Sequence, residues 1–74
     1  MRPEHIGIAI RKLRRDAKMT QSDLAEKVNI SRPNLSMIET GKNRNTSVST
    51  LIRIFNTLGY GVSIKLIKPE QDEY

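Results

Sequence analysis

Residues 20–41 read TQSDLAEKVNISRPNLSMIETG and carry the clearest structural pattern in the chain. Apolar residues recur at helical spacing in both of its halves, first as Leu24 and Val28 and then as Leu35 and Ile38. Each half therefore predicts a short helix with one buried stripe. Asn29 stands between the halves, where a tight turn needs a residue that tolerates a positive φ. Ala25 is small enough to let two helices cross closely beside it.

Hydroxyl side chains stand where the helices are expected to begin. Thr20 is a candidate N-cap for a helix from residue 21, and Asp23 occupies the acidic position of a capping box. Ser31 and Ser47 predict the starts of two later helices in the same way. Glycines stand where two of the helices are expected to end, at Gly41 and Gly59.

Two further amphipathic patterns flank the central pair. The first carries Ile6, Ile10, Leu13 and Ala17, and the last carries Val48, Leu51, Ile52, Phe55 and Leu58. Pro3 and Glu4 suit a first helical turn, but Gly7 has a low helix propensity, so we expect regular helix only from about Ile6. The prediction is a mainly α fold, a four-helix domain over residues 1–59 whose central pair forms a DNA-binding helix-turn-helix.

The period of the pattern changes after Gly59. Val62, Ile64 and Leu66 alternate with other residues and predict one short strand within residues 60–68. A lone strand leaves its backbone hydrogen bonds unpaired, so we expect it to pair with the same strand of a second copy in a homodimer. The alternative is a strand that folds back on its own subunit or stays frayed. Residues 69–74 form an acidic tail that we expect to be disordered.

The bulk composition limits the classes of function. The chain has 74 residues, a net charge of +5 and no cysteine, which excludes disulfides and Cys-ligated zinc. Three acidic residues lie near the C-terminus, Glu70, Asp72 and Glu73, and without them the net charge rises from +5 to +8. A small body this basic indicates an anionic partner such as nucleic acid. No apolar run is long enough to span a membrane, so we expect a cytoplasmic protein.

The residues from Ile10 to Gly41 resemble the phage-repressor type of helix-turn-helix, the XRE family. The matching motifs are Leu13-Arg14, Thr20-Gln21, Leu24-Ala25 and Ile38-Glu39-x-Gly41. The resemblance implies that Arg14 and Glu39 pair between the first and third helices, and that Thr20 and Gln21 contact the DNA backbone. Asn29 replaces the usual turn glycine. The strand after Gly59 is similar to the small antitoxins of the HipB type, whose C-terminal strands pair across a dimer.

A recognition helix enters the major groove with its N-terminal turn closest to the base edges. The residues expected to read bases are therefore Arg32, Pro33, Asn34, Ser36 and Met37. Arg32 fits guanine, Asn34 fits adenine, and the alternative for Arg32 is a phosphate clamp without sequence preference. The residues expected to contact phosphates are Thr20, Gln21, Ser31, Lys42, Asn43, Arg44 and Asn45. Arg11, Arg15 and Lys18 are expected to be solvated.

These features predict a dimeric, autoregulatory repressor of transcription. It is expected to bind a palindromic site in double-stranded DNA sequence-specifically. It is either the antitoxin of a pair with a HipA-like or other toxin, or a stand-alone phage or chromosomal repressor. An enzyme, a cofactor or a metal site is not expected, because the only histidine, His5, stands near the N-terminus without clustered carboxylates. RNA binding is disfavoured because the chain offers few aromatic residues for stacking.

Overall fold

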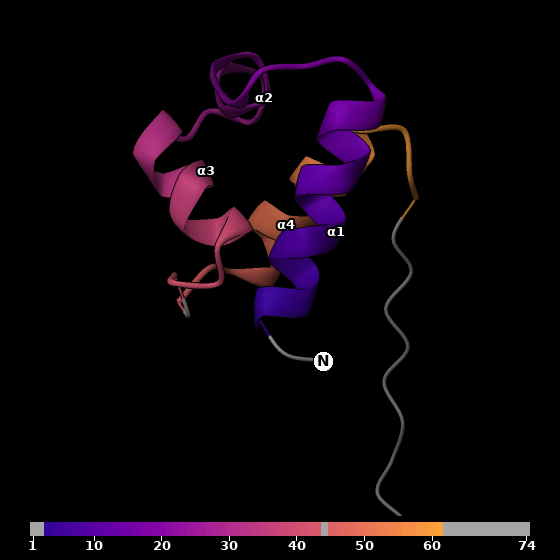
Figure 1. The fold of residues 1–74 in the computed structure, drawn as a ribbon. Coiled ribbons are helices and arrows are strands. Elements are labelled where there is room, and N and C mark those ends of the chain that lie inside the picture. The colour runs from indigo at the N-terminus through magenta and orange to yellow at the C-terminus, as the bar shows by residue number, and fades with distance from the viewer. Residues whose placement is uncertain (1–2, 44, 62–74) are drawn as a thin grey trace, which may run out of the picture.

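Four helices make up the described part of the chain, α1 (Pro3–Asp16), α2 (Gln21–Val28), α3 (Arg32–Glu39) and α4 (Val48–Thr57). The structure is a computed structural model and describes residues 3–43 and 45–61. α3 packs against α1 and α2, and α2 also packs against α4 (Figure 1). The predicted helical architecture is confirmed over these residues, and none of the four helices is long and apolar enough to cross a membrane.

Local sequence signals place the helix starts. The Thr20 hydroxyl accepts a hydrogen bond from the Asp23 N–H, and the Asp23 carboxylate accepts one from the Thr20 N–H, at 3.0 and 3.1 Å. This hydrogen bond from the Thr20 backbone lowers the pKa of Asp23 below its ordinary value, and the bond to the Thr20 side chain adds to the effect. Ser31 and Ser47 cap α3 and α4 through the N–H groups of Asn34 and Thr50. All three predicted caps are confirmed.

The turns follow from residues that accept a left-handed backbone. Asn29 has φ 61°, as predicted, and joins α2 to α3. Gly41 has φ 77° directly after the C-cap Thr40, so it ends α3 as a C′ glycine. Lys18 also has a positive φ, of 59°, in the turn between α1 and α2. No sequence signal marks Lys18 for this conformation, because lysine has no special tolerance for it.

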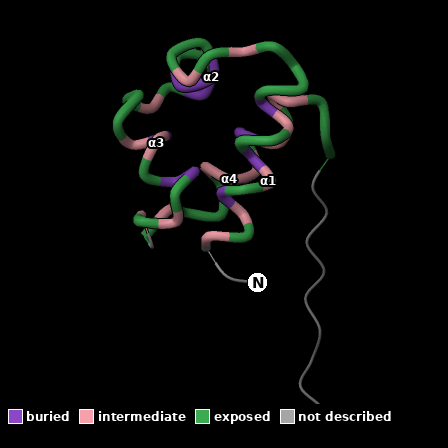
Figure 2. The backbone as a smooth tube through the Cα atoms, viewed as in Figure 1, coloured by how far each residue is buried: buried purple, intermediate pink, exposed green. Residues whose placement is uncertain are grey.

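The core lies where the four helices meet (Figure 2). Its fully buried members are Ile10, Leu24, Leu35 and Ile54, and Ala25, Val28 and Ile38 complete it. The stripes predicted for α2 and α3 are confirmed. The stripe predicted for α4 is partly wrong, because Val48 is 56% exposed while Ile54, which the predicted stripe omits, is buried. The observed core face keeps Leu51, Phe55 and Leu58 of the predicted stripe and adds Ile54.

α1 differs from its prediction at both ends. It begins at Pro3 rather than near Ile6, although Gly7 lies in its second turn. Gly7 is buried against the end of α3, where a side chain would overlap the carbonyl oxygens of Ile38 and Glu39. Its missing side chain thus lets α1 and the end of α3 approach closely. Ala17 lies beyond the helix and is exposed.

The remaining predicted features fall outside the described residues. These are the strand with Val62, Ile64 and Leu66, the tail at 69–74, and the loop residue Arg44. Within the described part the fold is wholly helical.

Candidate nucleic-acid interface

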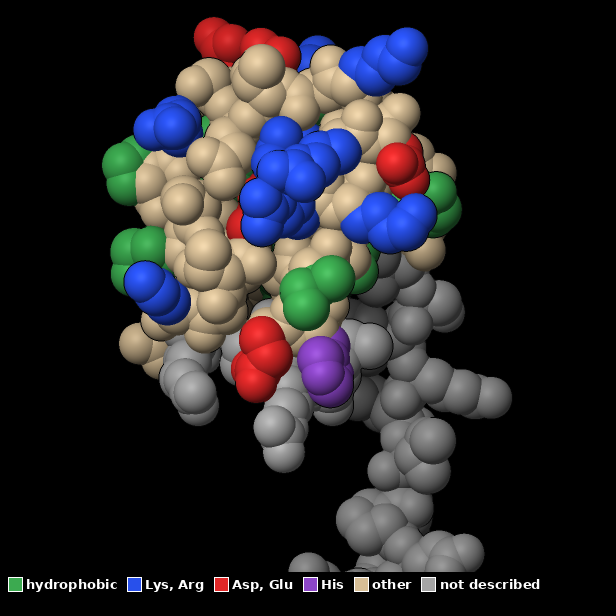
Figure 3. All heavy atoms as spheres, in the orientation of Figure 1, with side chains coloured by type: hydrophobic (Ala, Val, Ile, Leu, Met, Phe, Trp, Pro, Cys, Tyr) green, Lys and Arg blue, Asp and Glu red, His purple; other side chains and the backbone are tan. Residues whose placement is uncertain are grey.

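One face of the molecule gathers positive charge. Lys and Arg side chains cluster at its centre, between α1 and the pair formed by α2 and α3 (Figure 3). The surface is hollowed there, with a volume of about 550 Å³, and four arginines contribute to its lining: Arg11, Arg14, Arg15 and Arg32. Such a surface favours an anionic partner.

The leading half of α3 is free at the surface beside this hollow. Arg32 and Pro33 are exposed, Met37 is 45% exposed, and Asn34 and Ser36 are half-buried. The opposite side of the helix is held in the core by Leu35 and Ile38. The structure therefore brings all five residues expected to read bases onto the accessible side of one helix.

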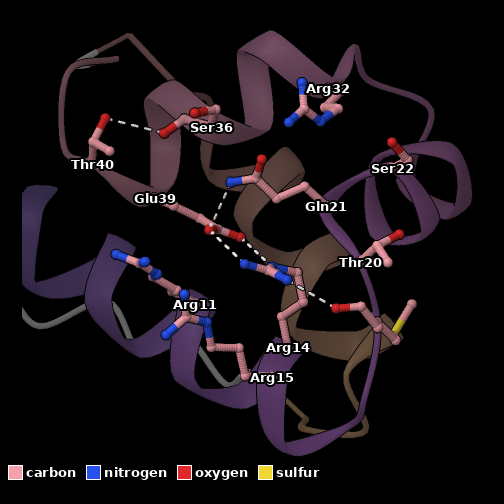
Figure 4. A pocket seen from close by; sticks show the side chains of 11 residues that line it. Arg11, Arg14, Arg15, Thr20, Gln21, Ser22, Arg32, Ser36, Glu39 and Thr40 are labelled. Atoms are coloured by element: carbon pink, nitrogen blue, oxygen red, sulfur yellow. Dashed lines mark hydrogen bonds and ion pairs between the residues drawn. The ribbon is translucent and has the colours of Figure 1, made fainter.

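A buried ion pair holds this helix against α1. The Arg14 Nε lies 2.7 Å from Glu39 Oε2, and Nη2 lies 3.1 Å from Oε1 (Figure 4). Arg14 is 7% exposed and Glu39 is 4% exposed. The two residues that the family resemblance pairs are thus brought together in a fork-to-fork geometry, which is the strongest form of such a contact.

The same carboxylate also fixes the start of α2. Gln21 donates a hydrogen bond from Nε2 to Glu39 Oε1 at 3.1 Å, and Arg14 Nη1 donates to the Met19 carbonyl at 2.8 Å. An amide nitrogen carries two hydrogens, so Gln21 retains one donor for another acceptor. Thr20 stands next to it with its hydroxyl accepting the capping bond from Asp23.

The loop after α3 is tied to α3 by side-chain amides. Asn43 Oδ1 accepts a hydrogen bond from the Asn45 backbone N–H at 3.0 Å, which identifies the other amide atom of Asn43 as the donor. That nitrogen donates to Asn34 Oδ1 at 2.6 Å. The Asn34 amide nitrogen is therefore left to donate outward. The sequence analysis predicts that Asn43 contacts a phosphate. No local sequence pattern predicts its hydrogen bond to Asn34.

The other predicted phosphate contacts stand at helix ends, with Thr20 and Ser31 as the N-caps of α2 and α3 and Lys42 and Asn45 after α3. Ser31, Lys42 and Asn45 are exposed, and Thr20 is exposed on the side of the hollow. The loop with Lys42 and Asn45 continues directly from the end of α3. Among the described residues, no group of three or more His, Cys, Asp and Glu side chains could hold a metal ion.

A capped helix, a tight left-handed turn and a second helix exposed at its N-terminus define a DNA-binding helix-turn-helix domain. The family model described as "Helix-turn-helix" matches residues 10–64. The chain belongs to this family, in its XRE, phage-repressor type.

Known relatives support the same class. The chain is 43% identical over 74 residues to the immunity repressor protein of Bacillus phage phi105, covering 93% of this chain and 51% of that protein. It thus spans about half the length of the curated relative it matches. Two crystal structures of the clp gene regulator ClgR from Corynebacterium glutamicum are similar, each with a TM-score of 0.76. They are 32% and 33% identical, and the matches cover 80% and 81% of this chain and 62% and 76% of those chains.

Proposed function

We propose that this protein is a sequence-specific repressor of transcription that inserts α3 into the major groove of double-stranded DNA. One observation carries the proposal: the N-terminal turn of α3 is exposed, while the rest of the helix is held by the core and by Glu39. An α-helix fits the major groove, and its first turn lies nearest the base edges.

Each exposed side chain of α3 has a chemically matched base partner. Arg32 is suited to the O6 and N7 acceptors of guanine, and Pro33 and Met37 present apolar surface to a thymine methyl. Ser36 can donate or accept. Asn34 has its oxygen bonded to Asn43, so its free amide hydrogens favour an acceptor on the base edge, and a bidentate adenine contact would use the second lone pair of that oxygen.

Phosphate contacts on both sides of α3 would orient it in the groove. Thr20, Gln21 and Ser31 serve one strand at the helix starts, and Lys42, Arg44 and Asn45 serve the other after the helix. Such contacts add affinity without sequence information. Asn43 acts less as a phosphate ligand than as the residue that orients Asn34.

We further propose a homodimer that binds a palindrome, with half-sites about 34 Å apart, one turn of the duplex. The basis is the unpaired strand expected at residues 60–68. The relatives are named as an immunity repressor and a gene regulator, which favours a stand-alone, autoregulatory repressor over an antitoxin with a toxin partner. Binding rather than catalysis is the proposed activity.

Selection from a pool of random duplexes tests the proposal. The wild-type chain should select an inverted repeat of one half-site. Arg32→Ala should lose the preference at one position of each half-site, because a good bidentate contact discriminates by about 1–3 kcal/mol, and should retain its affinity for unrelated DNA.

A uniform loss of affinity for all duplexes in Arg32→Ala would show a phosphate clamp instead of base reading. A selected site without internal symmetry would count against the dimer, and an enrichment of no sequence at all would overturn the proposed function.

A further inference from the structure

Two arginines of α1 have no role in the function proposed so far. Arg11 and Arg15 are exposed and lie four residues apart, so they share one face of α1. The sequence alone suggests that both are solvated. Both nevertheless line the hollow of about 550 Å³ between α1 and the helix-turn-helix.

Three helices contribute polar groups to this hollow. Arg11 and Arg15 come from α1, Thr20 and Ser22 from the start of α2, and Arg32 from the first residue of α3 (Figure 4). Along α3 the lining continues at Ser36 and Thr40, each one helical turn further on. The hollow therefore runs beside the exposed face of the recognition helix.

The charge in the hollow is not neutralised by the protein. Glu39 is the only carboxylate among the described residues that line it, and its two oxygens are bonded to Arg14 and Gln21. Within residues 3–43 and 45–61, no carboxylate pairs with Arg11, Arg15 or Arg32. The guanidinium groups of Arg11 and Arg15 repel each other and that of Arg32, and an anion bound by Arg11 and Arg15 would reduce this repulsion.

The position of the hollow identifies the anion. The major groove is about 12 Å wide and an α-helix is about 10–12 Å across, so phosphates of the two strands lie close on either side of an inserted helix. The hollow runs along α3 at Ser36, whereas the loop after α3 bonds through Asn43 to Asn34, which lies on nearly the opposite side of the helix. We infer that Arg11 and Arg15 bind phosphodiester groups of the DNA backbone, so that α1 grips the strand beside the recognition helix. This inference rests on the proposed function.

Charge substitution with a matched control tests the inference. Arg11→Gln and Arg15→Gln, alone and together, are compared with Lys12→Gln. Lys12 lies on the same helix and its loss changes the charge equally, but its ammonium pairs with Asp16 at 3.4 Å and does not line the hollow. All variants replace exposed side chains, and circular dichroism checks that their folds and melting temperatures match the wild type.

The readout is the salt dependence of binding to one operator duplex and one unrelated duplex. Each phosphate contact contributes about 0.9 to the slope of log K against log salt concentration. The slope measured for the double variant should be smaller by the contribution of about two phosphate contacts, equally on both duplexes. Lys12→Gln should keep the wild-type slope.

Equal slopes for the double variant and Lys12→Gln, in a chain that binds DNA, would overturn the inference alone. A wild-type chain that binds no duplex would overturn the proposed function and the inference with it.

Discussion

Glu39 is the residue at which three segments of the chain meet. Its carboxylate accepts hydrogen bonds from Arg14 on α1 and from Gln21 at the start of α2, while Glu39 itself ends α3. A buried ion pair of this kind is a weak source of net stability, because desolvation offsets the Coulomb attraction. Its loss is nonetheless costly, since the remaining charge stays buried without a partner.

Glu39→Gln should therefore destabilise the fold by about 3 kcal/mol, the lower end of the cost of breaking a buried pair. Asp16→Asn removes the carboxylate of the exposed Lys12–Asp16 pair and should cost at most about 0.5 kcal/mol. Urea unfolding at neutral pH compares the two. Similar losses for both variants would show that burial does not govern the energy of the Arg14–Glu39 pair.

Among the helices, α1 and the end of α3 can approach closely because Gly7 has no side chain. Two effects oppose each other when alanine is placed there. Helix propensity would stabilise α1 by about 1 kcal/mol. The added methyl group would overlap the carbonyl oxygens of Ile38 and Glu39, and overpacking of a tight contact costs about 1–3 kcal/mol. Backbone atoms cannot move aside as a flexible side chain can, so packing should win.

Gly7→Ala should consequently lower the melting temperature, with Gly61→Ala as the control. An alanine side chain at position 61 would meet no atom within 4 Å. Thermal unfolding followed by circular dichroism measures both. A Gly7→Ala chain that melts at or above the wild-type temperature would mean that α1 and α3 do not approach as closely as described.

The starts of α2, α3 and α4 and the turn at Asn29 could be predicted from sequence because their causes are local. Thr20 and Ser31 bond to N–H groups three residues away, and Asn29 needs only its own tolerance of positive φ. The burial of Ile54 and the α1 contact of Gly7 could not be predicted, because they depend on which helices face each other. The Asn43–Asn34 bond joins residues nine positions apart across a turn, and no periodicity reports it.

In the whole molecule, three sets of contacts hold α3 in one orientation at the candidate site. The core fixes the inner side of α3, the Arg14–Glu39 pair ties it to α1, and Asn43 ties it to the loop. The surface that faces outward is basic and surrounds the start of α3 (Figure 3). The family motif could be recognised in the sequence, whereas the hollow appears only once α1 lies beside α2 and α3.

In the proposed complex, DNA meets the protein at the leading edge of α3. Titration of an ¹⁵N-labelled chain with a DNA duplex, followed through the backbone amide resonances, tests this placement. The largest shifts should fall on residues 31, 32 and 34–37, since Pro33 has no amide hydrogen, with further changes at 20–22 and 42–45. Shifts centred on α4, with Arg32 and Asn34 unmoved, would contradict it.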